Sequence, residues 1–296
     1  MKRILTFILT LTLALSFCVN SFAAATTATA SETQTGTSEA QTDTSKTQAG
    51  TSEAQTDTSK VQAGASYGIS NLSGAPDIVA ESAVVMDANT GTILYGKEAD
   101  TKRYPASITK VMTALLAVEN CKMSDVITYS NAAVNGIEAG SSTAGINVGA
   151  KLTVEDSLYA LMLVSANEAA AAIAEHISGS TTEFAKLMTK RAKELGCTNT
   201  QFKNPHGLPN EEHYTTAHDM AIIFDAALKN DVFRYVDSTA AYTIPATNKY
   251  GERNCTSTNQ LINGARPYEG VYAGKTGHTA NAGRTLVTAA YRDGMD

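Results

Sequence analysis

Residues 107–119 read Ser-Ile-Thr-Lys-Val-Met-Thr-Ala-Leu-Leu-Ala-Val-Glu, and this stretch decides the fold of the chain. Its apolar residues recur at helical spacing but lie on several sides, which is typical of a helix at the centre of a domain. Pro105, just ahead, suits the first turn of such a helix or the approach to it. Lys110 interrupts this apolar stretch, so we expect an amine within a largely buried helix.

Strand patterns flank a run of helices. The β-prone segments are 82–87, 92–95, 241–244, 270–276 and 284–291, and Gly91 can provide the positive φ of a hairpin turn between the first two. Helices are predicted over 107–119, 153–163, 167–177, 181–195 and 216–229, with Thr153 and Thr181 as caps. This order predicts an α+β domain, in which N- and C-terminal strands form one antiparallel sheet and a helical subdomain is inserted between them.

A possible catalytic pair lies at the start of the buried helix. Ser107 and Lys110 are three residues apart, so their side chains share one helix face. A serine hydroxyl is a weak nucleophile until a base removes its proton, and a buried lysine next to a second cation can act as that base. The spacing alone occurs by chance in many helices, where it marks a capping serine and a solvated lysine.

Two later motifs favour the catalytic interpretation. Ser165-Ala166-Asn167 lies between two predicted helices, and Lys275-Thr276-Gly277 lies on a predicted strand. Ser-x-x-Lys, Ser-x-Asn and Lys-Thr-Gly in this order are the motifs of penicillin-binding proteins and β-lactamases. The fold expected from this resemblance is the penicillin-binding-protein/β-lactamase-like α+β domain.

Longer segments narrow the resemblance. Residues 104–113 closely resemble the nucleophile segment of low-molecular-weight D-alanyl-D-alanine carboxypeptidases. Other segments of the same family are resembled by residues 204–208, 213–217 and 219–221. Residues 274–278 and 282–287 are similar to that family's strand and its sequel. The resemblance covers residues 80–295, so it implies a serine-type carboxypeptidase that needs no cofactor.

The resemblance also implies a role for each motif residue. Ser107 would form an acyl-enzyme with a peptidoglycan stem peptide ending in D-Ala-D-Ala, and β-lactam antibiotics would acylate it covalently. Lys110 would be the base, and Ser165 would relay a proton. The expected substrate-binding residues are Asn167, Lys275, Thr276, Gly277 and His278.

The sequence departs from the family pattern at two places. The second motif has Ala166 where the family has glycine, and Glu168 where it has aspartate. The family also continues beyond residue 295 into another strand and a closing helix, and many members add a β-rich domain and an amphipathic membrane anchor. We therefore expect a chain that is truncated at the C-terminus, with membrane association only through a segment absent here.

Three other functions share features with this sequence. A class A β-lactamase would need a deacylating glutamate, but no Glu-x-x-Leu-Asn segment lies between the second and third motifs. A catalytically inactive wall-binding module is disfavoured by the intact Ser107, Lys110 and Lys275. A zinc peptidase could draw on His206, His213 and His218, but no His-Glu-x-x-His motif exists, so we expect no metal.

The first 66 residues have a different composition. Lys2 and Arg3 precede an apolar run and small residues, which is the order of a secretory signal peptide over 1–23. Residues 24–66 contain a Thr/Ser/Gln/Ala repeat, since 36–49 recurs almost unchanged as 50–63, and this predicts a flexible linker. The catalytic domain is expected over 67–296 in an exported protein of the cell wall, the periplasm or the outer face of the cytoplasmic membrane.

Charge and cysteine content restrict the partners. The net charge is −6, without a basic run, so nucleic acid is not an expected partner. Cys121, Cys197 and Cys255 follow the signal segment, and this odd number makes buried thiols the default prediction, with one disulfide open.

Overall fold

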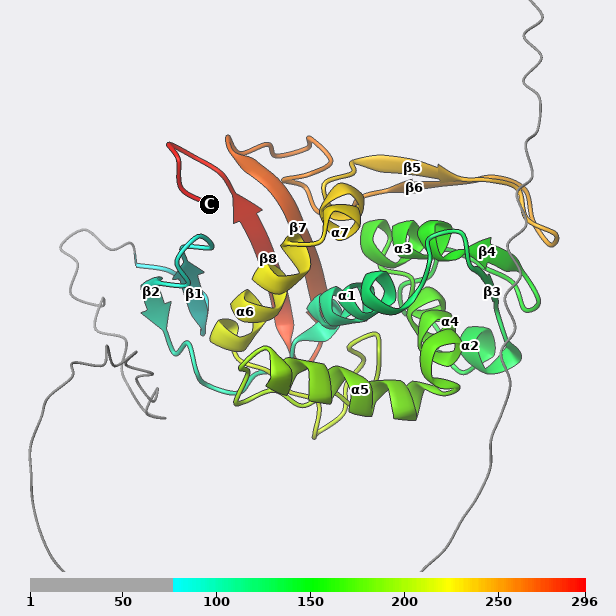
Figure 1. The fold of residues 1–296 in the computed structure, drawn as a ribbon, viewed down its shortest axis with the longest axis horizontal. Coiled ribbons are helices and arrows are strands. Elements are labelled where there is room, and N and C mark those ends of the chain that lie inside the picture. The colour runs from blue at the N-terminus through cyan, green and yellow to red at the C-terminus, as the bar shows by residue number, and fades with distance from the viewer. Residues whose placement is uncertain (1–76) are drawn as a thin grey trace, which may run out of the picture. The chain divides into compact units, whose positions relative to one another are not determined.

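The structure, a computed structural model, describes residues 77–296. The predicted signal peptide at 1–23 and linker at 24–66 lie outside the described residues. The helices are η1 (Ala106–Thr109, a 3-10 turn), α1 (Lys110–Asn120), α2 (Asn131–Asn135), α3 (Val154–Leu163), α4 (Asn167–Ser178), α5 (Thr181–Glu194), α6 (Ala217–Leu228) and α7 (Asp231–Asp237). The strands are β1 (Ala83–Met86), β2 (Ile93–Lys97), β3 (Val126–Thr128), β4 (Lys151–Thr153), β5 (Ala241–Ile244), β6 (Arg253–Thr256), β7 (Val271–Thr279) and β8 (Gly283–Ala290). Strands at both ends and helices between them confirm the α+β class (Figure 1).

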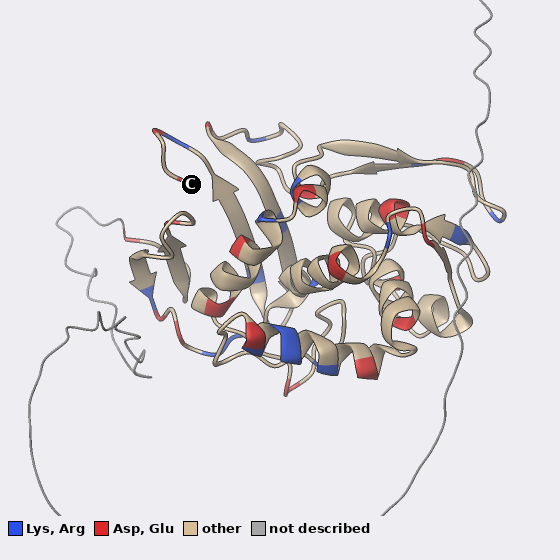
Figure 2. Cartoon of the chain, in the orientation of Figure 1, with Lys and Arg blue, Asp and Glu red and all other residues tan. Residues whose placement is uncertain are grey.

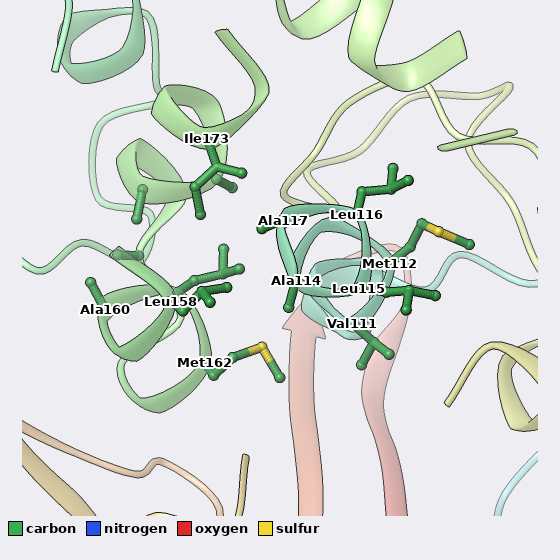
Figure 3. Packing of buried hydrophobic residues seen from close by; sticks show 14 of the residues in the cluster. Val111, Met112, Ala114, Leu115, Leu116, Ala117, Leu158, Ala160, Met162 and Ile173 are labelled. Atoms are coloured by element: carbon green, nitrogen blue, oxygen red, sulfur yellow. The ribbon is translucent and has the colours of Figure 1, made fainter. Parts of the chain in front are cut away.

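Helix α1 lies at the centre of the core, as its sequence predicts. Its side chains leave the helix on all sides, and Leu158 and Ile173 of α3 and α4 face one of them (Figure 3). The helix contacts α3, α4, α5, α6 and α7. This burial on every face explains why an apolar sequence without a polar stripe forms a helix here.

The helix ends follow ordinary capping chemistry. The Thr153 side chain accepts from the backbone N–H of Asp156 at the start of α3, and Gly179 ends α4 with a φ of 75°. Helix α5 is capped by Ser180, whose side chain accepts from the Glu183 N–H, so the prediction of Thr181 as the cap is wrong by one residue. The predicted helix at 107 begins with the 3-10 turn η1, and α1 proper starts at Lys110.

The predicted joining of the terminal strands into one sheet is wrong for the described residues. Strand β1 pairs with β2, β7 pairs with β8, and no ladder connects these two hairpins within residues 77–296. Helix α6 packs against both β1 and β8, and the Ala88 N–H donates to the backbone oxygen of Asp296 over 2.8 Å. The two hairpins are thus linked through α6 and the segment at Asp296 rather than by strand pairing.

Most charged side chains of residues 77–296 lie outside the core, and the buried exceptions include Lys110, Glu168 and Lys275. Figure 2 shows residues of both signs along α5, whereas α1 is nearly free of them. The described cysteines are free thiols: Cys197 and Cys255 are buried and Cys121 is half-buried. Among residues 77–296 there is no helix with the length and apolar character that a membrane span requires.

Leu115 tests the central role of α1. Its side chain is 2 % exposed within the core cluster, so Leu115→Ala should lower the free energy of unfolding by about 2–5 kcal/mol through lost burial and a residual cavity. Urea denaturation measures this loss. Val126→Ala, at a side chain that is 55 % exposed, should cost less than about 1 kcal/mol, and equal losses would contradict a core centred on α1.

Candidate active site

The Lys110 amine lies at the meeting point of three segments. Its Nζ is 3.1 Å from Ser107 Oγ, one turn earlier on the same helical segment. It donates to Asn167 Oδ1 at the start of α4 over 2.7 Å and to the backbone oxygen of His206 over 2.8 Å. The structure therefore brings Ser107, Lys110 and Asn167 together, although 57 residues separate the last two.

The surroundings of Lys110 disfavour its charged form. The residue is completely buried, and burial is the main reason why its pKa lies well below the usual lysine value. The positive charge of Lys275 lowers this pKa further, while Glu168 opposes the shift. Burial and a neighbouring cation together make the neutral form of this amine easier to reach than that of an exposed lysine.

Lys275 on β7 is the second buried amine of the site. Its side chain is 1 % exposed, and its Nζ donates to the backbone oxygen of Thr276 over 2.9 Å. Burial lowers the pKa of Lys275 to about 8, an effect that Asp237 partly offsets. Burial in turn raises the pKa of Asp237 to about 7, against the influence of Lys275. This carboxyl group, at the end of α7, lies behind the β7 motif.

The turn between α3 and α4 forms another side of the site. Ser165 has a φ of 61°, and its hydroxyl has no hydrogen-bond partner among the described residues. Ala166, where the family has glycine, has a φ of −58°, which any residue adopts. The departure from glycine therefore costs no backbone strain, because the positive φ falls on the serine instead.

Glu168 ties this turn to a neighbouring loop. Its Oε1 accepts from Thr143 Oγ1 over 2.7 Å and from the Ala144 N–H over 2.8 Å. From the other direction, Arg253 Nη2 donates to the backbone oxygen of Gly145 over 2.9 Å. The buried Glu168 carboxylate and the buried Arg253 guanidinium thus hold residues 143–146 in place beside Asn167.

Strand β7 approaches Ser107 closely because residue 277 is glycine. A Cβ at Gly277 would lie 2.8 Å from the backbone nitrogen of Ser107 and would also collide with Thr285 Oγ1. Thr285 Oγ1 donates to the backbone oxygen of Pro105 over 2.9 Å, which fixes β8 to the same turn. Gly277 thus lies against the Ser107 backbone nitrogen, and His278, the next residue of β7, is exposed.

Most of the described chain also matches known proteins. The family model for D-alanyl-D-alanine carboxypeptidases, peptidase family S11, matches residues 70–296. The chain belongs to peptidase family S11. The D-alanyl-D-alanine carboxypeptidase DacF of Bacillus subtilis is 39 % identical over 222 residues, which cover 73 % of this chain and 55 % of that protein.

Solved structures of S11 relatives share the fold. The Streptomyces K15 DD-transpeptidase is 36 % identical with a TM-score of 0.69, over 74 % of this chain and 88 % of that one. The D-alanyl-D-alanine carboxypeptidase of Mycobacterium tuberculosis is 32 % identical with a TM-score of 0.68, over 74 % and 81 %. They confirm the penicillin-binding-protein-like fold. The chain spans about half the length of the first curated relatives that it matches, 55 % and 54 %.

Two S11 site features were not expected from the sequence. The His206 carbonyl that accepts from Lys110 is a backbone group, so no side-chain pattern can reveal it. Gly207 has a φ of 88°, and a Cβ there would collide with the Ala106 carbonyl. The Asn-Pro-His-Gly-Leu segment did contain a sign of the second feature, because a glycine after such a turn favours positive φ and close approach.

His213 links the loop at Lys203 to the turn that contains Ser107 in this S11 domain. Its Nδ1 accepts from the Lys203 N–H over 3.1 Å, so the ring proton lies on Nε2, which donates to Thr109 Oγ1 over 2.9 Å. Burial lowers the pKa of His213 to about 4, and that of His206 to about 3. Both rings are therefore neutral at physiological pH.

The histidines that could have formed a zinc site, and the acidic residue next to His218, have other partners. His218 Nδ1 lies 3.1 Å from Asp100 Oδ1, while the Asp219 carboxylate accepts from Thr200 Oγ1 over 2.6 Å. Within residues 77–296 no group of three His, Cys, Asp or Glu side chains is arranged to hold a metal ion. The rings of His206 and His213 instead contact backbone and hydroxyl groups, and that of His218 contacts a carboxylate.

His213 makes stability dependent on pH. Because its pKa is lower in the folded state than the 6.5 of a free histidine, the unfolded chain takes up the proton first, and stability is lost as pH falls from 6.5 towards 4. Urea unfolding of the wild type should lose about 2 kcal/mol more between about pH 7 and about pH 5 than His213→Gln does. The control His176→Gln, at an exposed ring, should behave like the wild type. An equal loss in His213→Gln would contradict the buried neutral ring.

Proposed function

We propose that this chain is a serine D-alanyl-D-alanine carboxypeptidase that removes the terminal D-alanine from peptidoglycan stem peptides. One observation carries the proposal: a completely buried lysine amine contacts the Ser107 hydroxyl, the Asn167 amide and the His206 carbonyl, with a second buried lysine nearby. The family membership supports the choice of substrate, since the matching family is named for this bond.

Acylation begins with the neutral Lys110 amine. Its two N–H bonds serve Asn167 Oδ1 and the His206 carbonyl, so the nitrogen lone pair faces the Ser107 hydroxyl. Lys110 takes the Ser107 proton while Ser107 Oγ forms a bond to the carbonyl carbon of the penultimate D-alanine. When the C–N bond breaks, Ser165 relays a proton from Lys110 to the leaving D-alanine amine.

Developing charge is met by groups at the edge of β7. The carbonyl oxygen of the substrate would become negative near the backbone N–H groups of Ser107 and His278, which form the oxyanion hole. Gly277 permits this, because a side chain there would press against the Ser107 nitrogen. Lys275 and Thr276 bind the terminal carboxylate, and Asn167 binds the substrate backbone.

Deacylation repeats the proton transfers with water. Water attacks the ester carbonyl, Lys110 accepts the water proton, and the ester C–O bond breaks to restore the Ser107 hydroxyl. The products are D-alanine and a stem peptide that is one residue shorter. β-Lactams would follow the first half of this path and remain on Ser107 as inhibitors.

The N-terminal segments suit this substrate. We propose that residues 1–23 direct export and that residues 24–66 form a linker ahead of the catalytic domain. Support comes from the charged, apolar and small-residue order of the first segment and the low apolar content of the second. The proposed substrate, peptidoglycan, lies outside the cytoplasm, so the enzyme must be exported to reach it.

Covalent labelling tests the nucleophile. Incubation with benzylpenicillin should add the mass of one intact antibiotic to the protein, on the peptide that contains Ser107, and Ser107→Ala should show no adduct by mass spectrometry. Ser238→Ala, at an exposed serine, is the matched control and should label fully. Fast release of hydrolysed antibiotic would favour the alternative of a β-lactamase, and a folded wild type without an adduct would overturn the proposal.

Lys275 tests the electrostatic coupling. Its positive charge lowers the pKa of Lys110, so Lys275→Gln should move the rising limb of the acylation rate towards higher pH, because Lys110 then holds its proton more tightly. Stopped-flow acylation by a fluorescent penicillin over a range of pH measures the limb. The control Lys186→Gln, at a side chain that is 68 % exposed, should leave it in place. A limb that does not move in Lys275→Gln would contradict the coupling.

A further inference from the structure

The loop after β6 joins both sides of the site. The Thr258 N–H donates to the backbone oxygen of Leu163 over 2.9 Å, two residues before Ser165. The next side chain, Asn259, donates through Nδ2 to the backbone oxygen of Gly274 over 3.1 Å, directly before Lys275. The loop is thus anchored to the helical side and to β7 at once, and its position depends on both.

This loop is held rigidly by its own hydrogen bonds. The Asn259 N–H donates to Ser257 Oγ over 3.3 Å, and Asn263 Nδ2 donates to the backbone oxygen of Ser257 over 2.8 Å. Gly274 permits the approach, since a Cβ there would lie 2.9 Å from Asn259 Nδ2. A loop fixed on so many sides presents its exposed groups at defined positions.

The group that this loop presents to the third motif is the hydroxyl of Thr258. Thr258 is exposed, and its Oγ1 lies 3.2 Å from the Oγ1 of Thr276. In a pair of hydroxyls one O–H donates to the other oxygen, and one O–H is left for a ligand. An arriving carboxylate, which only accepts, can take both O–H groups at once. Lys275, next along β7, supplies the positive charge that attracts such an anion.

We propose that Thr258 is a further substrate-binding residue, which holds the terminal carboxylate of the peptide jointly with Thr276. The inference rests on the proposed function, since it names a second hydroxyl at the carboxylate position of that same site. Backbone anchoring on both sides places the Thr258 hydroxyl, and the side chain needs no rearrangement beyond rotation of its O–H.

A pair of thioester substrates tests this role. One is an N-acylated D-alanyl thioester of thioglycolate, whose carboxylate lies one carbon from the leaving sulfur, as that of D-alanine lies one carbon from the leaving nitrogen. The other carries a carboxamide instead of the carboxylate. The variants are Thr258→Val, which keeps the shape without the hydroxyl, and Thr258→Ser, which restores the hydroxyl, with Thr256→Val at an exposed position of β6 as the control.

Thr258→Val should lower kcat/KM about tenfold for the carboxylate substrate, mainly through KM, since a hydrogen bond to a charged group is worth at least that factor. The carboxamide substrate should change by less than about twofold, and Thr258→Ser and Thr256→Val should resemble the wild type. An unchanged Thr258→Val, or equal losses on both substrates, would overturn the inference while the wild type stays active. A wild type that neither cleaves the thioesters nor binds penicillin would overturn the proposed function, and this role with it.

Discussion

The structure depends on the burial of one lysine amine. A charged ammonium without water is costly, so the Lys110 site favours the neutral amine, and it satisfies the nitrogen with three partners from three parts of the chain. The turn at Ser107, the start of α4 and the loop at His206 must therefore meet at one point. The apolar surface of α1 provides the dry surroundings, because it is covered on every side.

Close approach of β7 to η1 is the second requirement of the site. This approach depends on Gly277, which faces the Ser107 nitrogen, and the approach of the loop at residue 207 to the same turn depends on Gly207, which faces the Ala106 carbonyl. Ala106 itself has a φ of 51°, so the backbone of the turn that contains Ser107 is strained. The surrounding hydrogen bonds, from Thr285 to Pro105 and from His213 to Thr109, hold that turn in place.

Ionisable groups behind the site form a connected set. Glu168 opposes the fall in the pKa of Lys110, Lys275 adds to it, and Asp237 partly offsets the shift of Lys275. Each of these side chains is buried, so their charges act on one another through little water. The protonation state of Lys110 is therefore a property of the whole set and not of the Ser-x-x-Lys spacing.

The sequence by itself determined the local features: the apolar helix, the Thr153 cap, the hairpin at Gly91 and the three motifs in their order. These depend on periodicity and near neighbours, which any stretch of chain contains. Only the tertiary structure decided that β1 and β8 belong to separate sheets within residues 77–296, that a backbone carbonyl at His206 binds Lys110, and that Thr258 lies beside Thr276. The physical reason is that these contacts join groups far apart in the chain, and some of those groups are backbone atoms. Contacts of either kind leave no periodic pattern in the sequence.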